Sequence, residues 1–267
     1  MGIRDILVHL DNSTTSAARL DLAIAYARKH GARLRGLYLI THFYYEPSAI
    51  GEKTDYDKTE QLFMNKTSEA GVASEWVFQD CSTMGANVCD LISLHAYFTD
   101  LVIIGQVNLS APIINIPTDL VERVVLSSGR PVLVIPYSGI FITAGERIMV
   151  AWKAGRESIR AINDALPHMQ RAQTVEIVEC KKTNDFYDET IESVKGFLLK
   201  HEIIATVDVI SSGNFPIGDM ILNNVCEKNI DLLVMGAFAP NRRGKLEMSP
   251  VAQHVLNHLT APVLMSH

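Results

Sequence analysis

Two charged residues follow matching apolar runs of the sequence and are the first candidates for ligand contact. Asp11 follows the first apolar run of the chain, and Lys153 follows a similar run that ends at Trp152. A carboxylate at such a place accepts hydrogen bonds from a ligand, whereas an ammonium group attracts an anion. Gly105 and Gly236 end two further apolar runs, where a missing side chain lets a ligand approach the backbone. These residue types predict binding at the ends of buried strands.

A basic loop in the second half of the chain adds a candidate anion site. The loop contains Arg242, Arg243 and Lys245 and precedes a stretch of helical period. Ser249 is expected to cap this helix, with Pro250 at its first position. Basic side chains beside a helix N-terminus favour a phosphate or carboxylate. The other interpretation of the basic loop is a solvated surface turn.

Motifs of the common nucleotide and metal enzymes are missing from the sequence. It contains no GxxxxGK[ST], GxGxxG, HExxH or GxSxG pattern. His9 and His42 have no clustered second ligand, so no metal site is expected. Trp152 has two interpretations, stacking on the ring of a ligand or packing in the core. We therefore expect a binding protein without catalytic residues.

The sequence repeats itself, and the repeat identifies the elements that position these residues. Matching segments follow in order, 142 or 131 residues apart: 6–11 with 148–153, and 100–105 with 231–236. The drop from 142 to 131 implies eleven extra residues in the first copy, most of them expected in a polar loop at 41–55. We predict two copies of one domain, at 1–137 and 145–267, joined by a short linker.

Each copy alternates short apolar runs with stretches of helical period. This pattern is typical of a parallel sheet covered by helices on both faces. The predicted fold class is α/β, with two tandem doubly wound parallel five-stranded sheets, each in the order 3-2-1-4-5. Strands are expected near 4–10, 33–40, 74–79, 100–105 and 131–135, and near 147–152, 173–180, 205–210, 231–236 and 262–266. Ligands of such sheets bind outside the carboxyl ends of strands 1 and 4, where the winding reverses.

The composition is that of a globular protein with an acidic surface. Hydrophobic residues make up 48% of the chain and charged residues 20%, with a formal net charge of −6. Because no basic stripe is present, nucleic acid is not expected as a partner. No apolar run reaches the roughly 18 residues of a membrane span, and no leader is recognisable, so we expect no membrane association and a cytoplasmic location. The four scattered cysteines are expected to be reduced.

Taken together, these segments resemble a known family. The opening residues 6–13 (ILVHLDNS), the closing residues 263–267 (VLMSH) and the strands that end at Gly105 and Gly236 are similar to universal stress protein (UspA-like) domains. The resemblance covers essentially the whole chain and implies a tandem member with an adenine-nucleotide α-hydrolase-like fold. In ATP-binding members of that family, an Asp at the end of the first strand meets the adenine. A G-2x-G-9x-G-[ST] motif after the fourth strand holds the phosphates.

The first copy keeps part of this pattern. Asp11 has the position of the adenine-binding Asp, and Gly105 that of the first motif glycine. Asn108 and Thr118 replace the other two glycines, and Asp119 replaces the Ser or Thr. We expect Asp119 in the first turn of the following helix, where its charge opposes a phosphate. The resemblance therefore implies an adenine contact without phosphate binding.

The second copy shows the opposite combination. Lys153 replaces the Asp, and only Gly236 remains of the motif, since Ala239, Ser249 and Pro250 hold the other positions. Together with the basic loop, Lys153 favours an anion. We therefore predict that any bound anion lies in the second copy, near Lys153, Gly236 and the start of the Ser249 helix.

These observations lead to a functional expectation with open alternatives. We expect a non-enzymatic stress-response or signalling protein with degenerate nucleotide-binding motifs and at most weak binding of a small ligand, ATP or another adenine nucleotide. The alternatives are an ATP-binding protein with slow ATPase or adenylate chemistry, and a ligand-free scaffold. The fifth strands of the two copies are expected to pair in an internal pseudo-dimer, and further homo-oligomerisation stays open.

Overall fold

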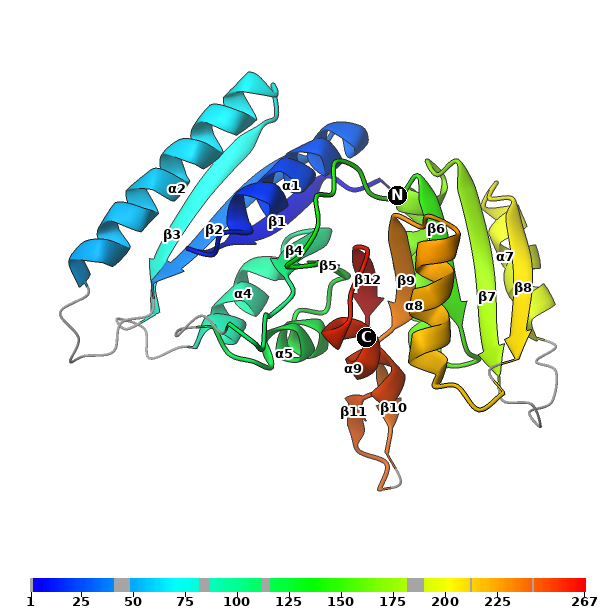
Figure 1. Ribbon diagram of the computed structural model, residues 1–267. Helices are drawn as coiled ribbons and strands as arrows, with labels where there is room; N and C mark the ends of the chain where they lie inside the picture. Colours follow the sequence, from blue (N-terminus) through cyan, green and yellow to red (C-terminus); the bar gives the residue numbers. More distant parts are fainter. Residues whose placement is uncertain are drawn as a thin grey trace. The chain divides into compact units, whose positions relative to one another are not determined.

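A computed structural model divides the chain into unit 1, Met1–Ile142, and unit 2, Thr143–His267. The structure describes residues 2–40, 49–81, 87–111, 116–181, 190–211, 213–241 and 243–267, the side chains of 49–54 excepted. The division falls inside the linker expected at 137–145. Each unit is an α/β domain with a parallel five-stranded sheet (Figure 1).

The sheet of unit 1 has the order β3-β2-β1-β4-β5. Its strands are β1 (Asp5–Leu10), β2 (Arg33–Ile40), β3 (Ser74–Asp80), β4 (Leu101–Gly105) and β5 (Val132–Ile135). Its helices are α1 (Ser16–His30), α2 (Ala49–Glu69), α4 (Val88–Ala96) and α5 (Leu120–Ser127). Helices α1 and α2 pack together on one face, and α4 and α5 on the other (Figure 1).

The sheet of unit 2 has the corresponding order β8-β7-β6-β9-β12. Its strands are β6 (Arg147–Trp152), β7 (Thr174–Lys181), β8 (Ala205–Ser211), β9 (Leu232–Gly236) and β12 (Val263–Ser266). Its helices are α6 (Arg156–Met169), α7 (Thr190–Lys200), α8 (Ile217–Glu227) and α9 (Pro250–Asn257). The predicted fold class and strand order are confirmed in both copies, and the strands lie within a residue or two of their expected bounds.

The central strands are apolar along their whole length because helices cover both of their faces. In unit 1, Ile6, Leu7 and Val8 of β1 are fully buried, as are residues 101–104 of β4. Strand β1 pairs in parallel with β2 on one side and with β4 on the other. The carboxyl ends of β1 and β4 therefore meet at one edge of the sheet, and β6 and β9 repeat this arrangement in unit 2.

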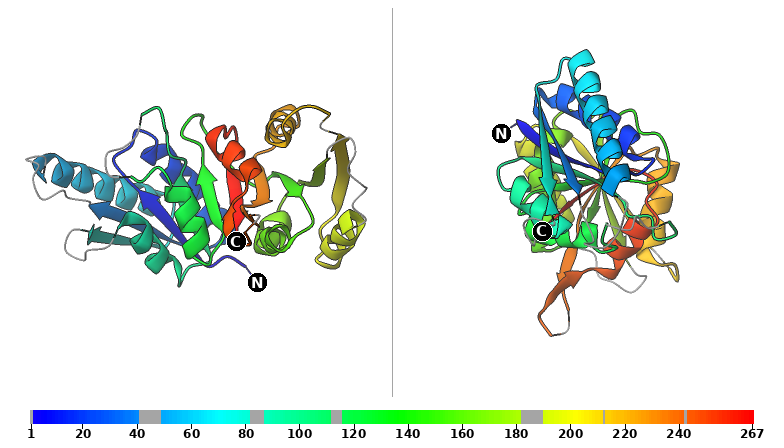
Figure 2. Two further views of the ribbon diagram at one scale, coloured as in Figure 1. Left: turned by 90° about the horizontal axis from the view of Figure 1, so that it is seen from below. Right: turned by 90° about the vertical axis from the view of Figure 1, so that its left-hand side faces the viewer.

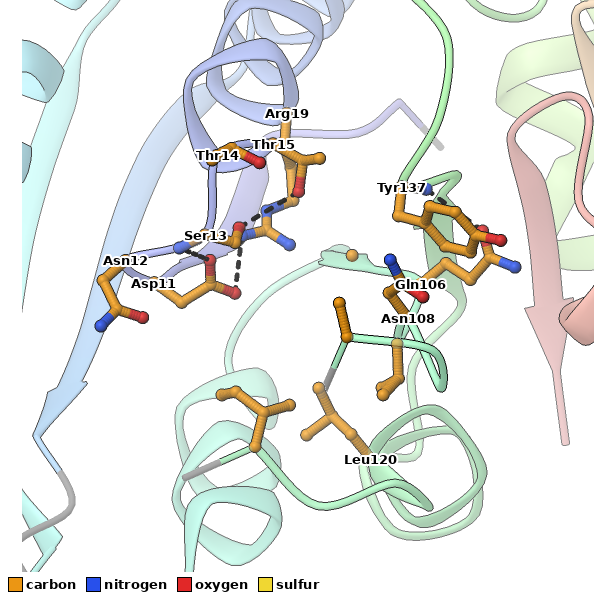
Figure 3. Close-up of a pocket in the computed structure, with 14 residues that line it drawn as sticks. Asp11, Asn12, Ser13, Thr14, Thr15, Arg19, Gln106, Asn108, Leu120 and Tyr137 are labelled. Atoms are coloured by element: carbon orange, nitrogen blue, oxygen red, sulfur yellow. Dashed lines mark hydrogen bonds and ion pairs between the residues drawn. The ribbon is translucent and has the colours of Figure 1, made fainter. Parts of the chain in front are cut away.

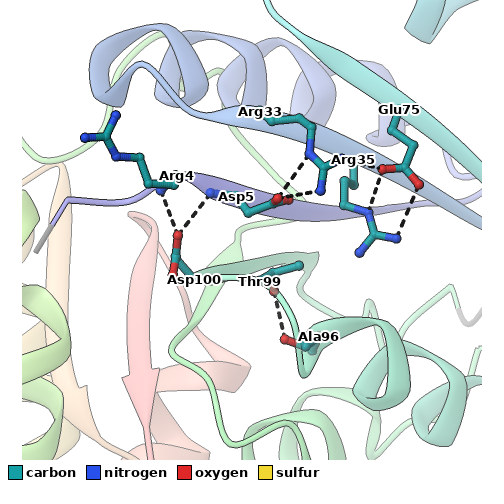
Figure 4. Close-up of polar contacts among 8 residues, drawn as sticks. All are labelled: Arg4, Asp5, Arg33, Arg35, Glu75, Ala96, Thr99 and Asp100. Atoms are coloured by element: carbon teal, nitrogen blue, oxygen red, sulfur yellow. Dashed lines mark hydrogen bonds and ion pairs between the residues drawn. The ribbon is translucent and has the colours of Figure 1, made fainter.

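A hydrogen-bond arrangement shared by the first strands of the two units supports the duplication. In unit 1, Oδ2 of Asp100 accepts hydrogen bonds from the backbone N–H groups of Arg4 (2.7 Å) and Asp5 (3.0 Å) (Figure 4). In unit 2, Oδ1 of Asp231 accepts from the backbone N–H of Arg147 (2.7 Å). Equivalent carboxylates thus satisfy backbone donors at the start of the first strand in both copies.

Residues 49–55 of the polar loop expected at 41–55 belong to a helix instead, and 41–48 lie outside the described residues. Helix α2 begins at Ala49 and has 21 residues, ten more than α7, its counterpart with 11. Tyr56 of α2 packs against Phe78 of β3, and Phe63 packs against Trp76. These aromatic contacts hold the described part of α2 along β3.

A two-stranded hairpin in unit 2 was not expected from the sequence. It consists of β10 (Phe238–Pro240) and β11 (Leu246–Met248), which pair antiparallel and project from the end of β9 (Figures 1 and 2). The basic loop lies at its tip. Within the described residues, no helix is long and apolar enough to cross a membrane. The expected pairing of the two fifth strands stays a prediction.

Candidate functional site

A hollow of about 320 Å³ lies in unit 1 where the carboxyl ends of β1 and β4 meet (Figure 3). This is the position at which ligands bind in open α/β sheets, and the volume is at the lower end of the range for small-molecule pockets. The residues that line it come from the β1–α1 connection, the loop after β4 and the chain after β5: Asp11, Asn12, Ser13, Thr14, Thr15, Arg19, Gly105, Gln106, Val107, Asn108, Ala111, Ile116, Leu120 and Tyr137.

Asp11 is the acidic residue of this lining, and both of its oxygens have partners. Oδ1 accepts a hydrogen bond from the backbone N–H of Ser13 (3.0 Å), and Oδ2 lies 2.8 Å from Nη2 of Arg19. Burial acts to raise the pKa of Asp11, but Arg19, His9 and the Ser13 hydrogen bonds together lower it to about 2. Asp11 is therefore ionised at neutral pH, and an adenine would have to compete with Arg19 for it.

Arg19 is the basic residue of the hollow and projects from the start of α1. Its side chain is 4% exposed, which makes its pair with Asp11 a buried one. A Cβ atom on Gly105 would lie only 1.9 Å from Nη1 of Arg19. Glycine at the end of β4 therefore makes room for the guanidinium, which lies between Asp11 and the loop after β4 (Figure 3).

His9 lies on β1 next to this ion pair but does not line the hollow. Its side chain is 1% exposed, and Nδ1 has no hydrogen-bond partner among the described residues. Burial lowers the pKa of His9 to about 4, with Asp11 acting against the shift and Arg19 adding to it. The imidazole is therefore neutral at physiological pH.

The opposite wall of the hollow is uncharged and combines amide with apolar side chains. Oε1 of Gln106 accepts a hydrogen bond from the backbone N–H of Tyr137 (3.1 Å), and Asn108 Oδ1 accepts from the N–H of Ser110 (3.0 Å). Asp119 is the N-cap residue of α5, one position before the helical turn in which it was expected, and it is exposed and makes no capping hydrogen bond. The hollow thus has one ion pair on one side and uncharged amide and apolar side chains on the other.

The chain that leaves β5 contributes to the walls around Arg19. Tyr137 lines the hollow itself. A few residues later, Phe141 lines a second, smaller cavity beside Arg19, together with Thr15 and Ala18 of the α1 region. The connector is therefore part of the wall around the guanidinium.

The equivalent edge of unit 2 is filled by the chain itself. A Cβ on Gly236 would lie 2.7 Å from the backbone carbonyl carbon of Glu157 and 2.9 Å from the backbone nitrogen of Ser158. The first turn of α6 therefore packs directly against the end of β9. Lys153 follows β6 and is exposed.

Trp152, the last residue of β6, is buried. It lines a different, largely apolar hollow of about 300 Å³ between α6 and α7, together with Ile159, Val194 and Phe197. The packing interpretation of Trp152 fits its 6% exposure. The structure does not bring Trp152 and Gly236 into one pocket.

The remaining predicted site residues lie on the hairpin and on α9. Arg243 is exposed at the hairpin tip, where its N–H donates to Oδ1 of Asn241 (2.9 Å). Arg242 lies outside the described residues. Ser249 caps α9, as expected, by accepting a hydrogen bond from the N–H of Ala252 (3.1 Å), with Pro250 at the start of the helix. The basic loop is thus displaced from Gly236 by the length of the hairpin, which the sequence analysis had not included.

Of the predicted residues, the structure brings Asp11 and Gly105 together in unit 1. The residue that sequence reasoning missed is Arg19. A signal was present, because Arg19, Ala23 and Ala27 share one helical face and Ala23 belongs to the apolar stripe that packs on the sheet. Across the described parts of the chain, no three His, Cys, Asp or Glu side chains gather as a metal site would require.

Comparison with known proteins identifies the fold. No protein-family model and no curated protein sequence matches the chain. Among solved structures, a universal stress protein from Archaeoglobus fulgidus matches with a TM-score of 0.74 at 16% identity, over 98% of this chain and 97% of that one. A protein of unknown function from Pseudomonas aeruginosa PAO1 matches with a TM-score of 0.62 at 16% identity, over 99% of this chain and 92% of that one. The chain has the universal stress protein fold over its whole length, which confirms the predicted resemblance at the level of the fold.

Proposed function

We propose that the chain is a non-enzymatic ligand-binding protein of the universal stress protein type, and that it binds a small molecule in the hollow of unit 1. The observation that carries this proposal is the buried Asp11–Arg19 pair in an open hollow at the carboxyl ends of β1 and β4. A buried ion pair is costly to keep unless it is well paired and has a use. Its position at the sheet's binding edge supports recognition as that use.

The charges of the hollow support binding without catalysis. General acid–base catalysis is most effective when the pKa of the catalytic group lies near the working pH. The pKa of Asp11 is about 2, and that of His9, behind it, is about 4. Both are too low for an efficient base at neutral pH. The serine and threonine hydroxyls of the lining therefore have no suitable base in Asp11 or His9 to activate them.

Adenine nucleotides are the first ligands to test, because the fold is that of universal stress proteins and Asp11 occupies the adenine-binding position of the family pattern. The proposal includes a role in stress response or signalling in the cytoplasm, without nucleic acid as a partner. The exposed charge of Asp119 at the start of α5 supports weak rather than tight binding of a polyphosphate.

The test combines ligand identification with two matched variants. Native mass spectrometry of the purified full-length protein detects a retained small molecule, and calorimetric titration measures the affinity for ATP, ADP and AMP. Ala111→Trp places a large side chain in the hollow of unit 1. Ala154→Trp does the same in the apolar hollow of unit 2 and serves as the control. We expect Ala111→Trp to reduce binding at least tenfold and Ala154→Trp to leave it unchanged.

Enzymatic turnover is the outcome that contradicts the proposal. ATP hydrolysis is expected to stay at background in the wild type. Turnover above background that is lost in Asp11→Asn identifies an enzyme. Binding to none of these nucleotides, with no retained molecule in the mass spectrum, supports a scaffold instead.

A further inference from the structure

We propose that the ligand of unit 1 carries an anionic oxygen group, a phosphate or a carboxylate, that binds directly to the guanidinium of Arg19. This inference rests on the proposed function, because it concerns the ligand of the same hollow. It differs from the recognition that the family resemblance implies, in which an Asp meets the adenine and glycine amides hold the phosphates. Here a buried side-chain cation is the primary contact.

The two members of the ion pair differ in how far their hydrogen-bonding capacity is used. Both oxygens of Asp11 have partners, the N–H of Ser13 and the guanidinium. Nε and Nη2 of Arg19 are buried and make no hydrogen bond within the described residues, although Nη2 lies close to Asp11 as an ion pair. A guanidinium offers five N–H donors, and a buried donor without an acceptor is destabilising. The unused hydrogen-bonding capacity of the pair therefore lies on its donor, Arg19, which also lines the hollow.

The position of the guanidinium suits an oxyanion. A planar guanidinium binds two oxygens of a carboxylate or phosphate at once. The side chain of Arg19 is 4% exposed, so water competes little for its charge. The hydroxyls of Ser13 and Thr15, on the same wall, hydrogen-bond each other at 3.1 Å and add neutral polar groups beside the guanidinium. Arg19 thus combines a fixed charge, low exposure and an opening towards the hollow.

The N-terminus of α1 acts in the same direction. Thr15, its N-cap residue, makes no side-chain capping bond, and the first turn of the helix contains no acidic residue. The positive end of the helix dipole at Thr15 therefore faces the hollow that Thr15 lines. It supports an anion that is already held by Arg19.

Unit 2 lacks this arrangement. The 142-residue offset places Ala161 at the position of Arg19, and the backbone of α6 packs against Gly236. Glu157 in the first turn of α6 adds a negative charge there. The proposed anion site thus belongs to unit 1, whereas the sequence favoured Lys153 and the basic loop of unit 2.

A ligand series on the wild type tests the inference first. Adenosine, AMP, inorganic phosphate and succinate are titrated by calorimetry at constant ionic strength. AMP is expected to bind at least tenfold more tightly than adenosine. Competition by inorganic phosphate but not succinate identifies a phosphate ligand, and the reverse identifies a carboxylate ligand.

A variant series then assigns the contact to Arg19. Arg19→Met alone leaves Asp11 buried and unpaired, so the double variant Asp11→Asn/Arg19→Met, which removes both charges, is the better test of binding. It is expected to lose about 10- to 100-fold in affinity for the anionic probe, the size of a charge-assisted hydrogen-bond contact. Arg19→Lys is expected to lose less affinity, since lysine keeps the positive charge but cannot bind two oxygens at once as a guanidinium does. Asp11→Asn alone removes the carboxylate that is paired with Arg19, so this variant is expected to bind the anionic probe more tightly than the wild type.

The outcomes separate this inference from the proposed function. If adenosine binds as tightly as AMP and Ala111→Trp weakens both, the hollow is the site and the anion inference is wrong. If the double variant binds AMP like the wild type, or if no anionic probe binds, Arg19 is not the contact. If AMP binds and Ala111→Trp has no effect, the proposed site itself is wrong.

Discussion

Replacing His9 by Leu should make the stability of unit 1 less sensitive to acid. The unfolded chain protonates His9 with its ordinary pKa of 6.5, whereas burial lowers the folded value to about 4. Between these values the unfolded state binds more protons, so stability falls as the pH falls from about 6.5 to about 4. The full shift corresponds to roughly 3 kcal/mol at about 1.4 kcal/mol per pKa unit. Between pH 7 and pH 5, the wild type should lose roughly 2 kcal/mol that His9→Leu retains.

The two tryptophans make this measurement specific to one unit. Trp76 lies in the aromatic cluster on β3 of unit 1, and Trp152 lies in unit 2. In a Trp152→Phe background, urea unfolding followed by fluorescence therefore reports on unit 1. Unfolding curves at pH 7, 6 and 5 give the free energy of unfolding with and without His9.

The prediction concerns how the difference in the free energy of unfolding between the parent and His9→Leu changes with pH. A difference that is the same at every pH reflects the change in packing. His258→Gln, which removes an exposed imidazole of unit 2, is the control and should unfold like the parent at every pH. Parallel losses in the parent and in His9→Leu from pH 7 to pH 5 would refute the assignment of a buried neutral imidazole beside the ion pair.

Three further substitution or labelling experiments test other parts of the structure. Gly236→Ala should destabilise unit 2 more than Gly105→Ala destabilises unit 1, because its Cβ meets helix backbone at 2.7 Å rather than the end of a flexible side chain; equal losses in urea unfolding contradict this. Ser249→Ala should cost about 1 kcal/mol by removing the cap of α9, and an unchanged thermal midpoint would show that the cap contributes nothing. Cys226, which is exposed, should react with maleimide well before Cys180, whose pKa burial raises to about 11; peptide mapping that finds Cys180 labelled first would contradict its burial.

The repeat and the strands could be predicted because their sequence signal is local. Residues such as 101–104 of β4 are apolar at every position, since both faces of a central parallel strand are buried. The same pattern recurs at β9. Matching the two apolar runs therefore predicted the order of the strands from the sequence. The cap at Ser249 was predictable for the same reason, because a Ser-Pro pair marks a helix start by its own chemistry.

The site was harder to predict because it depends on contacts between distant elements. The motif comparison drew attention to Gly105 and Gly236 as equivalent positions, but their neighbours differ: the side chain of Arg19 in one case and the backbone of Glu157 in the other. The apolar pattern of a strand does not predict which atoms pack against the glycine at its end. The hairpin that displaces Arg243 is formed by strands of three residues, too short for a periodic signal.

The connector after β5 is part of the ligand hollow as well as part of the covalent link between the two copies. Tyr137 lines the hollow together with Arg19, and Phe141 lines the smaller cavity beside Arg19. A molecule that moves the guanidinium would therefore meet these two aromatic side chains. The residues that follow the last strand of the first copy thus serve as binding wall and as connection at once.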